Sequence, residues 1–157
     1  IKLLASSRKA GSSYTCMVAP YMIDSAHPLC GVNGVFNGIF LHGNALGDAM
    51  FYGSGAGKLP TASAVVADVV DMARHQHTNI YIDWKPEKLT LVSYDDSVNR
   101  FFVRTDSPKE EVEKIFANVS YVENVVDGEY GFTTEAMAEK DFAAKADKIN
   151  VINRIRL

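Results

Sequence analysis

The sequence predicts an α+β chain in two parts: a partial sheet with one buried helix, followed by a ferredoxin-like βαββαβ unit. The first observation behind this is a change in composition. Residues 1–80 hold nine of the eleven glycines, whereas residues 81–157 hold 26 of the 35 charged residues. The second is the regular alternation of strand-like and helix-like segments after residue 97. We therefore expect one domain over 1–80, a linker over 81–96 and a second domain over 97–157.

The overall composition is that of an ordinary globular protein. Of the 157 residues, 47% are apolar and 22% are charged, which excludes a disordered chain. The net charge of −3 gives no general attraction to nucleic acid, and no apolar run approaches the ~20 residues that span a bilayer. Two cysteines without a signal-like segment predict a cytoplasmic protein with reduced thiols. The chain opens on Ile1 inside an apolar run, so we expect a piece of a longer protein.

Four short strands and one turn are expected in the first part. The strand-like segments are Ile1 to Ser6, Cys16 to Tyr21, Val32 to Leu41 and Ala49 to Tyr52. The last two are separated by a turn that is supplied with Gly and Asn, which predicts an antiparallel hairpin.

A helix should follow, with Thr61 or Ser63 as its N-cap and an end near Arg74. Valine, alanine and methionine fill most of its circumference, and a helix of that kind must be buried on several sides. Residues 1–80 offer too little cover for it, which is a second indication that the chain is part of a larger fold.

The second part reads as β-α-β-β-α-β. Its predicted elements are a strand Val98 to Arg104, a helix from Ser107 through Phe116, strands Tyr121 to Val126 and Glu129 to Met137, a helix Ala138 to Lys148 and a strand Val151 to Leu157. Ser107 is the expected N-cap, with Pro108 at the first helical position and Glu110 completing a capping box. Asp127-Gly128 predicts a tight hairpin turn.

One segment has an evident chemical interpretation. Gly53, Gly55 and Gly57 stand at alternate positions between a strand and a helix, where the backbone could approach a bound group. The following helix N-terminus would favour an anion. The spacing is neither that of a dinucleotide fingerprint nor that of a P-loop, so a ligand-contacting loop and a plain tight turn both stay open.

The other candidate residues give weaker evidence for a chemical role. The four histidines lack Cys or carboxylate partners at ligand spacing, so we expect no metal site. Cys16 and Cys30 are expected to be buried small apolar residues.

Three strings of the first part resemble homoserine dehydrogenase closely. They are Val32–Phe40, Phe51–Gly57 and Leu59–Asp68, in that order. The resemblance implies an NAD(P)-dependent oxidoreductase that interconverts aspartate semialdehyde and homoserine in threonine, methionine and isoleucine biosynthesis. It also implies that Gly53, Gly55 and Gly57 lie beside the NADP or NAD cofactor. It further implies a homo-oligomer, namely the dimer that subunits of that family form.

The family's catalytic lysine, its substrate-binding carboxylates and its cofactor fingerprint lie before the matching region. The resemblance therefore assigns no catalytic residue to this chain and implies that the chain alone is inactive, serving dimerisation and amino-acid feedback regulation.

Residues 97–157 resemble the ACT domain that many family members carry at the C-terminus. Asp106 and Pro108 match the D-x-P-G turn at which ACT domains bind a small amino acid such as threonine, but Lys109 stands where glycine is usual. Effector binding and a purely structural, pairing role both stay open. The alternative for the whole chain is a stand-alone ACT-type sensing or oligomerisation module without enzymatic activity.

Overall fold

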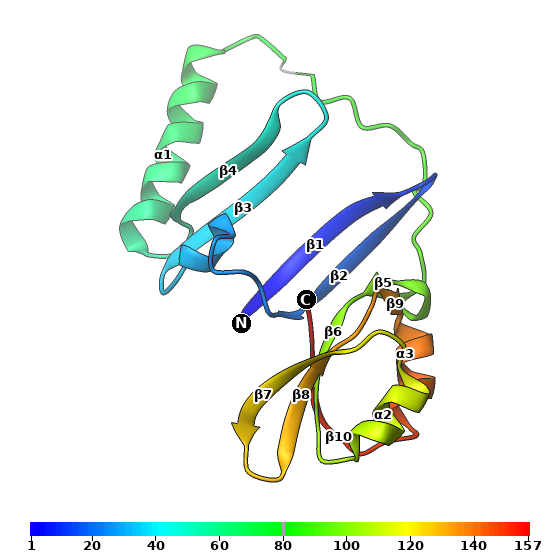
Figure 1. Ribbon diagram of the computed structural model, residues 1–157. Coiled ribbons are helices and arrows are strands. Elements are labelled where there is room, and N and C mark those ends of the chain that lie inside the picture. Colours follow the sequence, from blue (N-terminus) through cyan, green and yellow to red (C-terminus); the bar gives the residue numbers. More distant parts are fainter. Residues whose placement is uncertain (80) are drawn as a thin grey trace. The chain divides into compact units, whose positions relative to one another are not determined.

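The computed structural model describes residues 1–79 and 81–157, apart from the side chains of residues 123–125. Within them the chain is a mixed α/β structure with three α-helices and three sheets (Figure 1). It divides into two compact units, residues 1–23 with 88–157 and residues 24–87. Among the described residues, no helix has the length and apolar character needed to cross a bilayer.

The first unit is built on a six-stranded sheet in the order β1-β2-β10-β6-β8-β7. The strands are β1 (Lys2–Ala10), β2 (Ser13–Tyr21), β6 (Phe101–Thr105), β7 (Ser120–Val126), β8 (Glu129–Thr133) and β10 (Val151–Arg156). Every neighbouring pair is antiparallel except β2 and β10, which meet in parallel where Tyr21 lies opposite Arg156.

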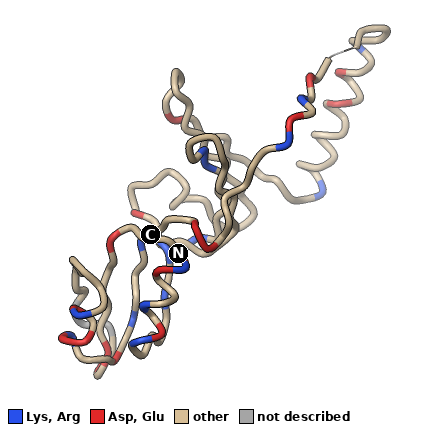
Figure 2. The backbone as a smooth tube through the Cα atoms, turned by 90° about the vertical axis from the view of Figure 1, so that its right-hand side faces the viewer, with Lys and Arg blue, Asp and Glu red and all other residues tan. Residues whose placement is uncertain are grey.

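Two helices pack on one face of this sheet, α2 (Lys109–Ile115) and α3 (Glu139–Ala146) (Figure 1). Between helices and sheet lies a core of six side chains, each at most 1% exposed: Phe101, Val103, Val112, Phe116, Phe132 and Phe142. Phe142 stacks on Phe101 with ring centroids 4.1 Å apart. Val112 and Phe116 contribute to this core from α2 and its C-terminal end, and Ile115 packs against it. Acidic and basic residues are interspersed along both helices (Figure 2).

The strand expected over Glu129–Met137 is divided in two. β8 ends at Thr133, and β9 (Met137–Ala138) pairs instead with β5 (Val98–Asn99) in a separate two-stranded sheet. Thr134 causes the break, because its Oγ1 accepts the Phe101 N–H at 3.1 Å and donates to the Glu135 carbonyl at 2.8 Å. These bonds turn the chain out of the larger sheet.

The expected capping box of α2 is wrong. The helix begins at Lys109, Pro108 occupies the cap position, and no side chain caps it. Ser107 is engaged elsewhere, since its Oγ accepts the Asn150 N–H at 2.9 Å. The Ser107 hydroxyl thus bonds to a residue 43 positions away in the sequence instead of capping the helix that follows it.

The two compact units do not coincide with the expected domains, of which the first was to end at residue 80. Residue 80 itself lies outside the described residues. Residues 1–23 join the C-terminal unit because β2 bonds to two of its segments. The Met22 N–H donates to the Arg156 carbonyl at 2.7 Å, and Tyr14 exchanges backbone bonds of 2.9 Å with Thr90 and Val92. A short 3₁₀ turn, η2 (Tyr94–Asp96), then leads from the linker into β5.

The second unit holds the predicted hairpin and helix. A 3₁₀ turn, η1 (Pro28–Gly31), precedes β3 (Phe36–Gly43), which pairs antiparallel with β4 (Gly47–Ser54), as predicted. The helix α1 (Lys58–Arg74) ends where expected but begins earlier. Its N-cap is Gly57, and neither Thr61 nor Ser63 caps it, because both already lie inside the helix.

Candidate functional site

The glycine loop joins β4 to α1, and one of its three glycines is required by the backbone conformation. Gly57 has φ +124°, a conformation that L side chains rarely adopt. A Cβ on Gly55 would run into the side-chain amide of Asn37. Gly53 lies in β4 opposite Asn37, and a Cβ there would meet nothing within 4 Å. The loop is therefore specified as glycine at Gly57 by its backbone. At Gly55 a side chain would require only Asn37 to turn away, and Gly53 is open on its outer side.

The first turn of α1 is suited to a negatively charged group. It carries Lys58 and no acidic residue, and no side chain bonds to its free N–H groups. Such N–H groups and the helix dipole favour anions. Gly57 brings the backbone close to this end of the helix, because its carbonyl accepts the Thr61 N–H at 3.1 Å. The residues present fit the approach of an anionic cofactor group, although they include no complete fingerprint for one.

The apolar sides of this unit are largely bare. No residue of α1 is buried, and Val65, Val66 and Val69 are each more than half exposed. In the hairpin, Ile39 and Phe51 are 61% and 63% exposed. Exposed apolar surface of this extent marks a face that another structure covers. This agrees with the sequence-based expectation that residues 1–80 offer α1 too little cover, since no residue of the helix is buried in its own unit.

In the other unit, the turn at Asp106 and Pro108 is closed by its own hydrogen bonds. The Thr105 hydroxyl donates to the Asn150 carbonyl at 2.7 Å and accepts the Ser107 N–H at 3.0 Å. The Asn150 amide donates to Asp106 Oδ1 at 2.9 Å, and the Tyr130 hydroxyl donates to the Ser107 carbonyl at 2.6 Å. The Ser107 N–H and the Asp106 carboxylate are thus already engaged within the turn.

Lys109 lies against two aromatic rings beside this turn. Its Nζ is 4.7 Å from the ring centroid of Tyr121 and 5.6 Å from that of Tyr130. The Tyr121 hydroxyl donates to Glu113 at 3.0 Å. Burial, together with Glu113 as hydrogen-bond partner and neighbouring charge, raises the pKa of Tyr121 to about 12. Lys109 therefore has a packing role of its own.

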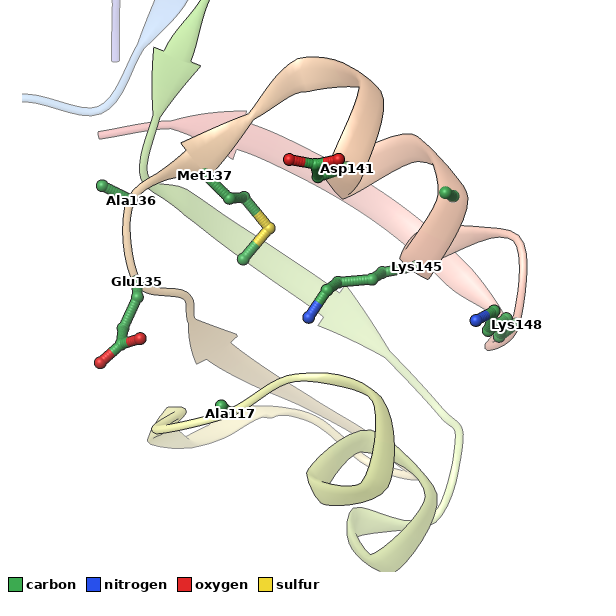
Figure 3. A pocket seen from close by; sticks show the side chains of 8 residues that line it. Ala117, Glu135, Ala136, Met137, Asp141, Lys145 and Lys148 are labelled. Carbon is green, nitrogen blue, oxygen red and sulfur yellow. The ribbon is translucent and has the colours of Figure 1, made fainter. Parts of the chain in front are cut away.

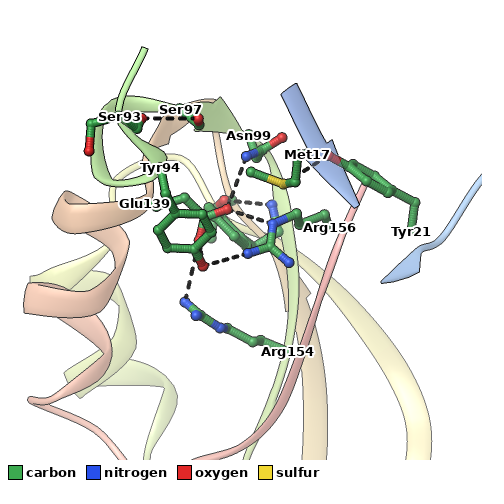
Figure 4. Close-up of polar contacts among 11 residues, drawn as sticks. Met17, Tyr21, Ser93, Tyr94, Ser97, Asn99, Glu139, Arg154 and Arg156 are labelled. Carbon is green, nitrogen blue, oxygen red and sulfur yellow. Dashed lines mark hydrogen bonds and ion pairs between the residues drawn. The ribbon is translucent and has the colours of Figure 1, made fainter. Parts of the chain in front are cut away.

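A buried polar cluster, which sequence patterns did not reveal, surrounds Glu139 at the start of α3 (Figure 4). The carboxylate, 1% exposed, accepts bonds from Arg156 Nε at 2.6 Å, Asn99 Nδ2 at 3.0 Å and the Tyr94 hydroxyl at 3.0 Å. Arg154 lies 3.9 Å away. Burial disfavours the charged form of Arg156, but the bond to Glu139 and its charge raise the pKa of Arg156 above the usual value.

This cluster, called here the Glu139 cluster (Tyr94, Asn99, Glu139 and Arg156), ties together three parts of the first unit. Tyr94 comes from the end of the linker, Glu139 from α3, and Arg156 from the strand that pairs with β2. The Glu139 N–H also donates to the Ser97 carbonyl at 3.0 Å. Its structural task is to fix the segment from Tyr94 to Asn99 on the domain that follows.

A hollow of about 460 Å³ opens beside α3, facing the chain that follows α2 and the loop after β8 (Figure 3). Its lining residues are Ala117, Glu135, Ala136, Met137, Asp141, Ala144, Lys145 and Lys148. Acidic and basic side chains are equal in number around it, and the remaining residues are small or apolar.

The remaining candidates add no chemistry. In the described part of the chain, no group of three or more His, Cys, Asp or Glu side chains could hold a metal ion. Both cysteines are free, but Cys16 is exposed and Cys30 is half-buried. The expectation of two buried thiols is therefore wrong for Cys16, which lies on the outward face of β2.

Comparisons with known proteins agree on one family. Residues 1–70 match the family model described as homoserine dehydrogenase. The homoserine dehydrogenase of Neisseria gonorrhoeae is 34% identical over 118 residues, which cover 70% of this chain and 27% of that protein. The one from Synechocystis is 50% identical over 76 residues, 46% of this chain and 18% of that protein. The chain spans about a quarter of the length of the first of these relatives.

Solved structures extend the similarity to the rest of the chain. A homoserine dehydrogenase from Thiobacillus denitrificans superposes with a TM-score of 0.80 at 28% identity, covering 99% of this chain and 42% of that one. A homoserine dehydrogenase from S. aureus superposes with a TM-score of 0.71 over 99% of this chain and 41% of that one. At 24% identity, the second similarity shows the fold alone.

Proposed function

Because this chain belongs, through residues 1–70, to the homoserine dehydrogenase family, we propose that it is the C-terminal part of such an enzyme. The whole protein would interconvert aspartate semialdehyde and homoserine with NADP or NAD, on the route to threonine, methionine and isoleucine. The observation that carries this proposal is the match over the hairpin, the glycine loop and α1. The two free thiols are typical of a cytoplasmic location.

The contribution of this chain to the cofactor site would be the loop from Gly53 to Gly57. Bound NAD(P) supplies or accepts the hydride in this reaction class. The loop would hold backbone against the cofactor at Gly55 and Gly57, and the first turn of α1 would favour a nearby anionic group. We assign no catalytic residue to the chain, and we infer that it is inactive alone.

The bare faces of α1 and of the β3–β4 hairpin support a role in assembly. Within a complete subunit, the rest of the catalytic domain would cover α1, whose valines are exposed in this chain. Sheet surface from the hairpins would contribute to a homodimer. A face of this kind is stable in water only when it is covered, so we expect the isolated chain to self-associate.

We further infer that residues 97–157 form an ACT-like regulatory domain. Apart from the two-residue strand β9, the element order from β6 to β10 is β-α-β-β-α-β, and the four strands of the larger sheet lie in the order β10-β6-β8-β7, which supports a ferredoxin-like arrangement. The closed turn at Asp106 and Pro108, with Lys109 packed on two rings, favours a structural role for that turn over threonine binding there.

The decisive experiment is an activity assay of the complete protein that contains this chain, followed by oxidation of NADPH or NADH with aspartate semialdehyde as substrate. We expect turnover in the complete protein and none in the chain alone. Absence of turnover in the folded complete protein would refute the enzymatic proposal and favour a stand-alone module. Light scattering of the chain alone tests the assembly role, which a monodisperse monomer would contradict.

A further inference from the structure

We propose that the side chain of Asn37 binds the carboxamide of the nicotinamide ring and so helps to select the cofactor. This inference deepens the proposed function and rests on it, because it gives a residue of β3 a role at the cofactor site. It depends on the position of the Asn37 side chain, on the bare strand surface around it and on the glycine at position 55.

The Asn37 side chain lies against the glycine loop. The hairpin of β3 and β4 runs into this loop and then into α1 (Figure 1), and its register sets Asn37 directly opposite Gly53. A Cβ built on Gly55 would lie 3.1 Å from Asn37 Cγ and would overlap Asn37 Nδ2. The φ angle of Gly55 is not among the positive ones. Glycine at this position is therefore explained by the Asn37 amide, which occupies the place of a side chain there.

The strand surface around Asn37 leaves room for a flat group. A Cβ on Gly53, across the hairpin, would meet nothing within 4 Å, and Asn37 itself is exposed. The alternation of the strands places Ile39 and Phe51 next on the same face, and both are more than half exposed. A planar group could thus lie on backbone at the two glycines, with apolar side chains on one side and the Asn37 amide within reach.

The Asn37 amide has hydrogen-bonding capacity to spare. Its side chain forms no hydrogen bond or ion pair with any residue in the described part of the chain. A primary carboxamide offers two N–H donors and a carbonyl acceptor. A phosphate or carboxylate has only acceptors and would leave the Asn37 carbonyl unmatched. A second primary carboxamide matches donor to acceptor in both directions, and the nicotinamide ring of NAD(P) carries such a group.

The first turn of α1 complements this assignment from the other side of the loop. Its free N–H groups and Lys58 suit an anionic group. The loop therefore joins a neutral donor and acceptor on the strand side to positive potential on the helix side. A nicotinamide dinucleotide carries both kinds of group in one molecule, so a single ligand satisfies both.

Calorimetric titration of the complete protein that contains this chain tests the role of Asn37. The probes are NADP⁺ or NAD⁺, whichever the unaltered protein binds more tightly, and the 3-acetylpyridine analogue of the same dinucleotide. The analogue has a methyl group in place of the carboxamide nitrogen, so it keeps the acceptor and loses the donors. We expect Asn37→Ala to weaken binding of both probes, but to shrink the preference for the natural cofactor about fivefold, which corresponds to one hydrogen bond.

A second variant reaches the same contact from the other partner. The methyl group of Gly55→Ala would take the place of the Asn37 amide, so the amide must turn away and the preference should shrink in the same way. The double variant Asn37→Ala/Gly55→Ala should reduce the preference no further than either single change, because both act on one contact. Asn44→Ala, in the exposed turn at the other end of the hairpin, is the matched control and should leave both affinities unchanged.

The possible results separate this inference from the proposed function. An unchanged preference in Asn37→Ala overturns the inference. An equal loss of affinity for both probes also overturns it, since a purely structural role or a contact with a sugar hydroxyl would give that result. In both cases the unaltered protein still binds its cofactor, so the proposed function stands. If the unaltered protein binds neither NADP⁺ nor NAD⁺, the proposed function fails and the role of Asn37 fails with it.

Discussion

The Glu139 cluster makes the sharpest stability prediction, and Glu139→Gln is the substitution that tests it. Gln keeps the size of the side chain but removes the charge that faces Arg156 at 2.6 Å. Breaking a buried ion pair by removing one partner costs about 3–5 kcal/mol. Because the Arg156 side chain is 13% exposed and solvent compensates part of its charge, we expect the lower end, about 3 kcal/mol.

The assay is urea unfolding of the full chain, in which a loss of stability at constant slope lowers the midpoint. Lys140→Met is the matched control. It breaks the neighbouring Lys140–Asp96 pair of 2.6 Å, in which both side chains are more than half exposed, so the midpoint should barely move. The double variant Glu139→Gln/Arg156→Met should lose less than the sum of the two single losses, because no unpaired buried charge remains. Equal midpoints for Glu139→Gln and Lys140→Met would refute the reasoning.

Three further outcomes follow from the structure. Gly57→Ala should destabilise α1 by roughly 1–3 kcal/mol, because φ +124° is strained for a residue with a side chain. Gly53→Ala should have little effect, and unfolding followed by the circular dichroism of the helix measures both variants. Phe142→Ala should cost about 3–5 kcal/mol in urea unfolding, since the ring is fully buried; a loss below 1 kcal/mol would contradict the packing described. Tyr121 has a pKa of about 12 against the ordinary 10.0, so folding favours its protonated form. The stabilisation is complete below pH 10 and is lost as the pH rises toward 12. Glu113→Gln should lower that pKa in a near-ultraviolet titration, and an unchanged midpoint would exclude Glu113 as a cause.

Local signals in the sequence predicted those elements that local contacts determine. Asp127-Gly128 predicted a hairpin, and Gly128 indeed adopts φ +79° between β7 and β8. The apolar circumference of α1 predicted a helix without sufficient cover, which its exposed valines confirm. The glycine loop was recognised because a positive φ favours glycine, and this holds at Gly57.

The features that sequence reasoning missed depend on distant partners. Ser107 has the sequence of a helix cap, yet Asn150, 43 residues away, takes its hydroxyl. The Glu139 cluster joins residues 40, 45 and 62 positions apart, and no spacing rule connects them. Its one visible signal is a glutamate in the first turn of a helix, which is also the commonest place for a solvated one.

Strand β2 contacts the C-terminal part of its unit at two places, and the distance between them must be bridged by the chain that leaves after Tyr21 and returns at Leu91. That connecting chain contains the second unit, residues 24–87. The chain departs after Tyr21, beside Arg156, and returns at Leu91, beside Tyr14. Seven residue steps along an antiparallel strand amount to about 24 Å. Any segment that joins Tyr21 to Leu91 therefore needs at least about seven extended residue steps, to which residues 22–23 and 88–90 already contribute.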